Sequence, residues 1–219
     1  MTREEFRRKA AEIPDWAPGW DAIDQEFECL YPGQEPAHFG TDMRARAVFG
    51  GDQYLDGYSL FRSAKGYLHL VTYGMTELYA EEEMLGAEWN RWGYEMTMKI
   101  RAEEAGQCVW AIGLMAQLAR YTYQKSDGFS AGRFLGFGGQ ALDGGDSRIT
   151  ALLFAADTEA RTQESIYGKT EFLQLVGITQ PEFLALKRNP ERVPELMEKL
   201  KAVNPDLVTD MGRTESLIV

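Results

Sequence analysis

The chain has 219 residues, of which 44% are hydrophobic and 12% aromatic, so it can close a substantial core, and intrinsic disorder is excluded. Its formal net charge of −11 repels phosphate backbones and anionic lipid, which argues against nucleic acid or a membrane as a partner. The same charge attracts basic partners, although solubility alone is an equally good reason for it.

The two cysteines, Cys29 and Cys108, each lie in an apolar helical pattern, which predicts buried free thiols rather than a disulfide. Residues 1–13 are charged and helix-like, unlike a secretory leader. No stretch approaches the roughly 20 apolar residues of a membrane span. We therefore expect a cytoplasmic protein.

The first part of the chain predicts two helices followed by strands. Thr2 can cap a helix that Pro14 ends, and a second helix over 20–30 stops at Pro32-Gly33. From about residue 37 the hydrophobic period is two, and runs around Tyr54 to Leu60 and over 67–73 predict an antiparallel hairpin. The acid-rich stretch 77–88 is expected to be a loop. A strand over 94–101 is predicted with its apolar residues inward and its polar residues facing water.

The second part predicts a helix over 107–124, with its apolar side beginning at Val109, and apolar strands over 149–155 and 171–178. Thr179-Gln-Pro-Glu182 has the spacing of a capping box and opens a helix. Pro190 and Pro194 open another, and 216–219 predict a short final strand. No repeat or linker interrupts residues 1–219. We predict a single α+β domain with a mixed, largely antiparallel sheet flanked by helices.

The residues that usually carry catalysis are sparse. The two histidines, His38 and His69, have no Cys, Asp or Glu at metal-ligand spacing, so no metal site is predicted. His69 lies in an alternating strand, which favours a paired structural role. No nucleophile elbow and no Gly-Lys-Ser/Thr phosphate loop occurs, although a Ser-His-Asp arrangement assembled by the fold remains open. We predict that the chain is not an enzyme.

The glycine-rich segment 132–146 is the alternative site. Gly136-Phe-Gly-Gly-Gln-Ala141 matches the dinucleotide fingerprint formally, but Gly144-Gly145 breaks any helix that should follow. A loop that needs positive φ is the simpler interpretation. The rival hypothesis is a nucleotide or small-molecule binding protein, or an unrecognised enzyme, using this segment. We expect no cofactor.

Five glutamates, at positions 77, 81, 82, 83 and 88, form an acidic cluster beside tyrosine-rich strands. A solvated loop is favoured over a carboxylate site. Aromatic side chains next to charge are common in protein-binding patches. Tyr67, Tyr73 and Tyr79 are equally compatible with a place in the core, so both interpretations stand.

Eight blocks of the sequence, in order between about residues 17 and 213, resemble the Suppressor of fused family, specifically its N-terminal domain. They are Ala17-Pro-Gly-Trp-Asp-Ala-Ile-Asp24 with Leu30-Tyr-Pro32, Leu55-Asp-Gly-Tyr-Ser-Leu-Phe-Arg62, Leu68-His-Leu-Val-Thr-Tyr-Gly-Met-Thr-Glu-Leu-Tyr79, Trp92-Gly-Tyr-Glu-Met-Thr-Met-Lys-Ile100, Leu118-Ala-Arg-Tyr-Thr-Tyr-Gln124, Leu142-Asp with Asp146-Ser-Arg-Ile149, Phe172-Leu-Gln-Leu-Val-Gly177 and Thr209-Asp-Met-Gly-Arg213.

The resemblance implies a protein that binds other proteins and does no chemistry. The animal member holds zinc-finger transcription factors of the Hedgehog pathway in the cytoplasm and takes up a short peptide as an added strand between two domains. This chain has room for the first domain alone. The resemblance places partner-binding candidates at Leu68, His69, Tyr73, Glu77, Tyr79, Glu81 and Glu82. Single-domain bacterial relatives resemble immunity proteins, for which the partner would be a basic toxin.

Overall fold

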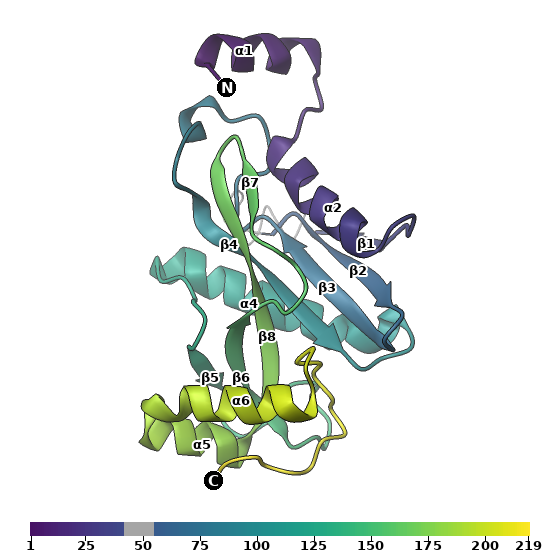
Figure 1. The fold of residues 1–219 in the computed structure, drawn as a ribbon, viewed down its shortest axis with the longest axis vertical. Coiled ribbons are helices and arrows are strands. Elements are labelled where there is room, and N and C mark those ends of the chain that lie inside the picture. Colours follow the sequence, from purple (N-terminus) through teal and green to yellow (C-terminus); the bar gives the residue numbers. More distant parts are fainter. Residues whose placement is uncertain (42–54) are drawn as a thin grey trace.

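The computed structural model describes residues 1–41 and 55–219. Within these residues eight strands form one mixed sheet, in the order β1-β2-β3-β4-β8-β6-β5, with β7 paired to β8 (Figure 1). The strands are β1 (Ala37–Gly40), β2 (Gly57–Ser63), β3 (Tyr67–Tyr73), β4 (Trp89–Ile100), β5 (Phe134–Gly136), β6 (Ile149–Ala156), β7 (Gln163–Ser165) and β8 (Gly168–Thr179). β4 and β8 run parallel, and the other described pairings are antiparallel, which confirms the predicted sheet.

The helices begin and end close to where the sequence predicts. They are α1 (Arg3–Glu12), α2 (Pro18–Leu30), α4 (Val109–Lys125), α5 (Gln180–Arg188) and α6 (Val193–Val203), with 3₁₀ turns at Glu82–Met84, Ala105–Cys108 and Pro190–Arg192. The predicted cap at Thr2 and the predicted capping box at Thr179 both form, and each is a capping box: Thr2 with Glu5 at α1, and Thr179 with Glu182 at α5. Each box satisfies backbone N–H groups that a helix start leaves without partners.

The sheet is covered by helices on both faces (Figure 1). Alternate residues of β8 pack against the helices of the two faces. Leu173 and Leu175 pack into the core beneath α4. Phe172 points to the opposite face, where its ring meets Phe27 of α2 edge-on at 5.5 Å. Val176 and Ile178 lie on that second face under α5 and α6. The domain is therefore a three-layer α+β structure, with α4 on one side and α2, α5 and α6 on the other.

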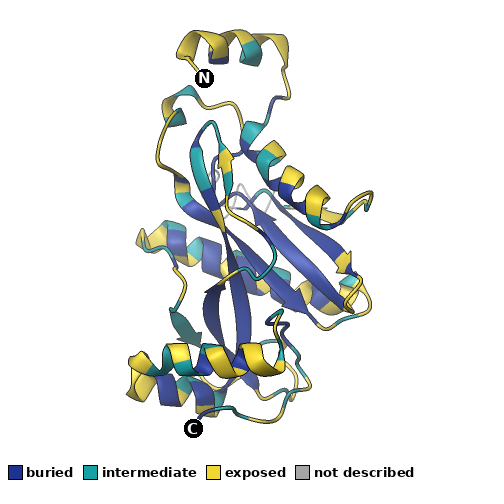
Figure 2. Cartoon of the chain, viewed as in Figure 1, coloured by how far each residue is buried: buried dark blue, intermediate teal, exposed yellow. Residues whose placement is uncertain are grey.

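The polar residues of β4 are buried, so the predicted wet face is wrong. Glu95, Thr97 and Lys99 are each 0% exposed. Thr97 and Lys99 form a polar seam between the α2 core and the α5–α6 core, where Thr97 donates to Asp157 and Lys99 donates to Thr158, which also donates to the Asp206 carbonyl. Glu95 is enclosed instead by Thr72, Gly74 and Thr76. β4 lies between β3 and β8 in the middle of the sheet, and a central strand in such a sheet is buried on both faces (Figure 2).

Three further expectations need correction. Cys108 is buried as predicted, but Cys29 is exposed at the surface of α2. Val109, predicted on the apolar side of α4, is 60% exposed. Residues 216–219 form no strand; the Leu217 N–H instead donates to Glu182 at 2.9 Å, which fixes the tail against α5. The predicted strand residue Tyr54 lies outside the described residues.

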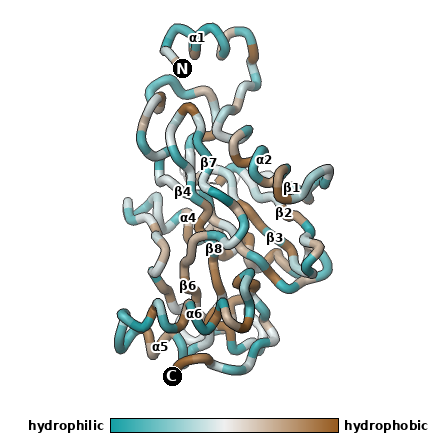
Figure 3. Tube along the Cα trace, in the orientation of Figure 1, coloured by the Kyte–Doolittle hydropathy of each residue, from teal (hydrophilic) through white to brown (hydrophobic). Residues whose placement is uncertain are grey.

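Hydrophobic segments gather in the sheet and in the helix faces turned toward it (Figure 3). In the part of the chain that the structure describes, no helix is long and apolar enough to cross a membrane.

Candidate functional site

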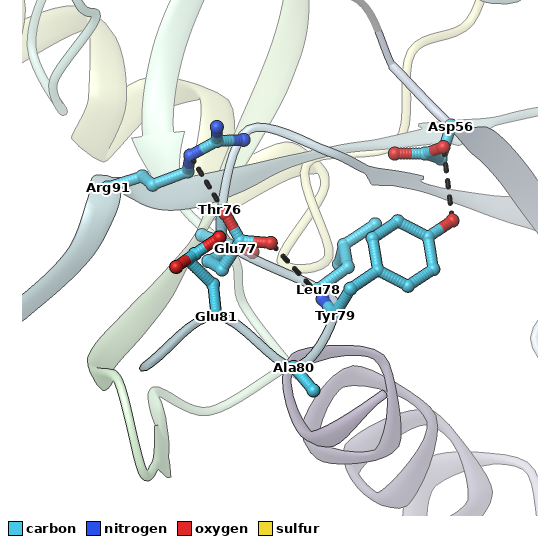
Figure 4. A pocket seen from close by; sticks show the side chains of 8 residues that line it. All are labelled: Asp56, Thr76, Glu77, Leu78, Tyr79, Ala80, Glu81 and Arg91. Atoms are coloured by element: carbon cyan, nitrogen blue, oxygen red, sulfur yellow. Dashed lines mark hydrogen bonds and ion pairs between the residues drawn. The ribbon is translucent and has the colours of Figure 1, made fainter. Parts of the chain in front are cut away.

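A surface pocket of about 250 Å³ brings together three of the predicted partner-binding residues, Glu77, Tyr79 and Glu81 (Figure 4). Its wall is completed by Asp56, Thr76, Leu78, Ala80 and Arg91. Three carboxylates and one guanidinium line it, so the pocket carries net negative charge. A cavity of this size is smaller than a typical drug-sized ligand site. It suits a single side chain of a partner.

Hydrogen bonds and an ion pair fix the polar groups of the pocket (Figure 4). The Tyr79 hydroxyl donates to Asp56 at 3.1 Å, and the Tyr79 N–H donates to the Glu77 carboxylate at 3.2 Å. The other Glu77 oxygen lies 3.3 Å from Nε of Arg91. Tyr79 nevertheless stays 47% exposed. An aromatic ring beside fixed carboxylates is a suitable contact for a basic side chain.

The backbone that carries these groups is held from several sides. The Asn90 side chain accepts the Glu77 N–H at 2.8 Å and donates to the Glu77 carbonyl at 3.1 Å. The Tyr167 hydroxyl donates to the Tyr79 carbonyl at 2.6 Å and accepts the Glu81 N–H at 2.9 Å. The pocket wall is thus preorganised before any partner arrives.

Gly19, in the first turn of α2, also supports the pocket segment, because its backbone contacts the backbone of Glu77 and Leu78 directly. Its N–H donates to the Leu78 carbonyl at 3.0 Å, and an ideal Cβ on Gly19 would lie 1.8 Å from the Glu77 carbonyl oxygen. A side chain at this position must push the pocket segment away from α2.

We therefore expect Gly19→Ala to destabilise the protein by about 1–3 kcal/mol, the usual range for overpacking. Gly113 in α4 is the matched control, because no atom outside the adjacent backbone of its own helix lies within 4 Å of its ideal Cβ. Gly113→Ala should stabilise the protein by about 0.5–1 kcal/mol through helix propensity. Urea unfolding of both variants tests this, and equal effects of the two substitutions would contradict the contact.

The acidic residues of the loop over 77–88 continue the negative surface beyond the pocket. Glu81, Glu83 and Glu88 are exposed, which confirms a solvated loop there. Glu77 departs from that expectation, because it is 8% exposed. Glu82 lies outside the pocket and pairs with Arg7 of α1 at 2.7 Å, and this hydrogen bond lowers the pKa of Glu82.

The other predicted residues, Leu68, His69 and Tyr73, lie inside the fold. Leu68 packs in the core beneath α4, while His69 and Tyr73 point to the opposite face. Tyr73 stacks on Trp20 with ring centroids 4.3 Å apart and donates to Asp24 at 2.8 Å. The structure does not bring these side chains to the pocket surface.

His69 is a paired structural histidine, as predicted. Its Nδ1 lies 2.8 Å from the Tyr31 hydroxyl and its Nε2 lies 3.0 Å from Asp157. Asp157 also lies 3.1 Å from the Lys99 ammonium and accepts the Thr97 hydroxyl at 2.6 Å. Burial alone would raise the pKa of Asp157, but His69 and Lys99 outweigh it and hold that pKa well below its usual range.

The order hydroxyl, imidazole, carboxylate in Tyr31, His69 and Asp157 matches a nucleophilic relay in form. Its environment does not suit catalysis. The His69 and Asp157 side chains are each 0% exposed, so a substrate does not reach the imidazole. Burial also raises the pKa of the Tyr31 hydroxyl, which disfavours the phenolate that would attack. These residues hold the seam together.

Glu95 is a second buried carboxylate, and it has no cationic partner among the described residues. It accepts hydrogen bonds from the Thr72 hydroxyl at 2.6 Å, the Gly74 N–H at 3.0 Å, and the Thr76 N–H and hydroxyl at 2.9 and 2.7 Å. Burial raises the pKa of Glu95 to about 7 in spite of these bonds. Because Thr76 lines the pocket, Glu95 supports the pocket from behind.

The glycine-rich segment forms the edge strand β5 and the turns after it, antiparallel to β6. Positive φ angles at Gly132, Gly138, Gly139 and Gly144 confirm the predicted loop. The dinucleotide fingerprint needs a strand that turns directly into a helix, and no helix begins in this described stretch before α5. Nor do the described residues contain three His, Cys, Asp or Glu side chains grouped to hold a metal ion.

Several supporting residues were not predicted from sequence. Asn90 and Arg91 come from a bulged part of β4, where Arg91 has a φ of 51°. Asp56 precedes β2, and Tyr167 lies in the turn between β7 and β8. No motif marks them. The one usable signal was Gly19, since a glycine in the first turn of a helix often allows close approach of another backbone.

The sequence of this chain matches one protein family over most of its length. Residues 51–214 match the Suppressor of fused protein (SUFU) family. The chain is 29% identical over 214 residues to the Suppressor of fused homologs of Homo sapiens and Mus musculus, covering 91% of this chain and 44% of each relative. It therefore spans less than half the length of these curated relatives.

Solved structures show the same architecture. The Sufu–Fu complex matches with a TM-score of 0.75 at 24% identity, covering 91% of this chain and 92% of that chain. Drosophila Suppressor of Fused matches with a TM-score of 0.76 at 24% identity, covering 91% of this chain and 51% of that one. A SUFU homolog from Neisseria gonorrhoeae has a TM-score of 0.60 at 16% identity, covering 92% and 98%.

Proposed function

Because this chain belongs to the Suppressor of fused family, we propose that it is a non-catalytic domain that binds and neutralises another protein in the cytoplasm. The observation that carries the proposal is the preorganised acidic pocket around Tyr79, together with the solvated glutamates that continue it. A basic partner fits this surface, because complementary charge raises the association rate and disfavours acidic competitors.

The finer part of the proposal is that the partner is a toxin and the chain its immunity protein. The net charge of −11 supports a basic partner over a neutral one. A protein captured by this chain from the source cell should then be harmful when it is expressed alone and harmless when it is co-expressed with the chain. A captured partner that is harmless alone would remove the toxin assignment and leave partner binding in place.

A charge-reversal pair tests whether the acidic surface is the binding surface. Glu81→Lys with Glu83→Lys is expected to slow association with the captured partner at least tenfold, measured by surface plasmon resonance at low salt. The control is Glu191→Lys with Glu198→Lys, which changes the net charge equally on exposed residues near and on α6. Similar association rates for the two pairs would show that net charge, and not this surface, governs binding.

A further inference from the structure

Helix α1 stands off the body of the molecule (Figures 1 and 2). It contacts the body through a small aromatic cluster. Within α1, all of whose residues are described, Phe6 is the one buried side chain. Phe6 is 3% exposed, its ring centroid lies 5.1 Å from that of Trp16, and Tyr167 completes the cluster. Met84, Leu85 and Ile166 border it as partly buried neighbours. The floor under α1 is therefore apolar and aromatic.

Charge complements this apolar contact. The Arg7 guanidinium donates two hydrogen bonds to the Glu82 carboxylate, at 2.7 and 2.8 Å, and the Lys9 ammonium lies 4.6 Å from the Trp16 ring centroid. Residues 77–88 contain five glutamates and no lysine or arginine, whereas α1 contains four basic residues and three glutamates. α1 thus presents the Phe6 ring and the basic side chains of Arg7 and Lys9 to an apolar floor that Glu82 borders.

The packing of α1 is also incomplete. A hollow of about 490 Å³ lies between Lys9 of α1 and residues of α2 and β7, among them Asp21, Gln25 and Glu164. A helix of 10 residues is too short to be stable alone in water, so α1 depends on this limited contact. Segments with few buried contacts open locally at low free-energy cost. Release of α1 would expose the floor while the sheet stays folded.

We propose that the surface beneath α1, formed by Trp16, Glu82, Met84, Leu85 and Tyr167, binds a basic amphipathic helix of the partner protein, and that α1 occupies this surface until the partner helix displaces it. Helix-in-groove recognition of this kind uses an aromatic anchor and charged flanks, both of which α1 already shows. The proposal rests on the proposed function for the existence of a partner.

The surface beneath α1 is joined to the pocket by one side chain. The Tyr167 ring belongs to the floor, and its hydroxyl bonds to the backbone of Tyr79 and Glu81 in the pocket wall. A partner helix bound in place of α1 would therefore lie next to the acidic pocket. One partner can contact both.

The test uses the full chain and a fluorescent synthetic peptide of residues 1–14 as the probe. In the Phe6→Ala/Arg7→Ala variant, α1 should no longer occupy the surface beneath it. The peptide should then bind this variant at least tenfold more tightly than it binds the wild type. Hydrogen exchange should become faster in α1 alone, which shows that the rest of the fold is intact. Adding Glu82→Arg should abolish peptide binding, and a peptide carrying Arg7→Glu should restore it.

Equal peptide binding to wild type and variant, or failure of the reversed charges to rescue it, would overturn the proposal. The peptide assay needs no partner, so its outcome is separate from that of the proposed function. If a captured partner binds the wild type and the Phe6→Ala/Arg7→Ala variant equally tightly, partner binding stands and displacement of α1 is refuted.

Discussion

Asp157→Asn should destabilise the protein by about 3–5 kcal/mol, the usual cost of removing one partner from a buried charge network. The carboxylate is fully buried and lies within 3.1 Å of both the His69 ring and the Lys99 ammonium. An asparagine amide would turn its N–H groups toward His69, Thr97 and Lys99, which are themselves hydrogen-bond donors to the Asp157 carboxylate. Lys99 would keep Glu159, at 3.1 Å, as its remaining carboxylate partner among the described residues.

The matched control is Asp206→Asn. Asp206 pairs with Lys65 at 2.6 Å, but the Lys65 side chain is 52% exposed, so the pair should contribute no more than about 1 kcal/mol. Urea unfolding at pH 7 measures both variants. A loss below 1 kcal/mol for Asp157→Asn would contradict the network as a stabilising unit.

The same network should make the free energy of unfolding depend on pH in the acid range. Because the pKa of Asp157 is lower in the folded state than its ordinary value of 3.8, its contribution is present above that value and is lost as pH falls below it. Asp157→Asn should therefore flatten the stability curve below about pH 4.

Glu95 should give a pH dependence of the opposite sign. Its pKa rises from 4.5 to about 7 on folding, so its contribution is full below pH 4.5 and is lost as pH rises through about 7. The free energy of unfolding of the wild type, relative to that of Glu95→Gln, should fall by about 3 kcal/mol between pH 4 and pH 8.

Glu182→Gln provides the contrasting control. Burial alone would raise the pKa of Glu182, but hydrogen bonds from Arg213 outweigh burial and lower that pKa. The free energy of unfolding of the wild type, relative to that of Glu182→Gln, should therefore rise as pH rises. Thermal unfolding of the three proteins across this pH range measures both signs. A difference between wild type and Glu95→Gln that is constant with pH would show that Glu95 titrates at its ordinary value.

Elements with a local cause were predictable from sequence. The capping boxes at Thr2 and Thr179 depend on residues three positions apart, and the hairpin of β2 and β3 depends on one short turn. The strand interior of β4 was not predictable in the same way. Alternating polar residues suit a wet face, and the segments that bury Thr97 and Lys99, residues 157–159 and 206–209, lie far along the chain.

In the candidate site, too, the residues close together in sequence were predictable and their distant supports were not. Glu77, Tyr79 and Glu81 are neighbours in sequence, so an acidic and aromatic patch could be predicted there. Their supports, Asn90 and Tyr167, come from separate strands and turns, and side-chain pairing across a sheet has no signature in one sequence. The resemblance to the family places Leu68, His69 and Tyr73 with the patch, but successive residues of β3 point to opposite faces of the sheet, and all three are buried.

Site-specific photo-cross-linking tests the central claim most directly. A photo-reactive benzoylphenylalanine in place of the 47% exposed Tyr79 should cross-link a basic protein from the source cell. The same group in place of Val203, which is 66% exposed on α6, should not. Cross-links of equal yield at both positions, or at position 203 alone, would contradict partner binding at the acidic pocket.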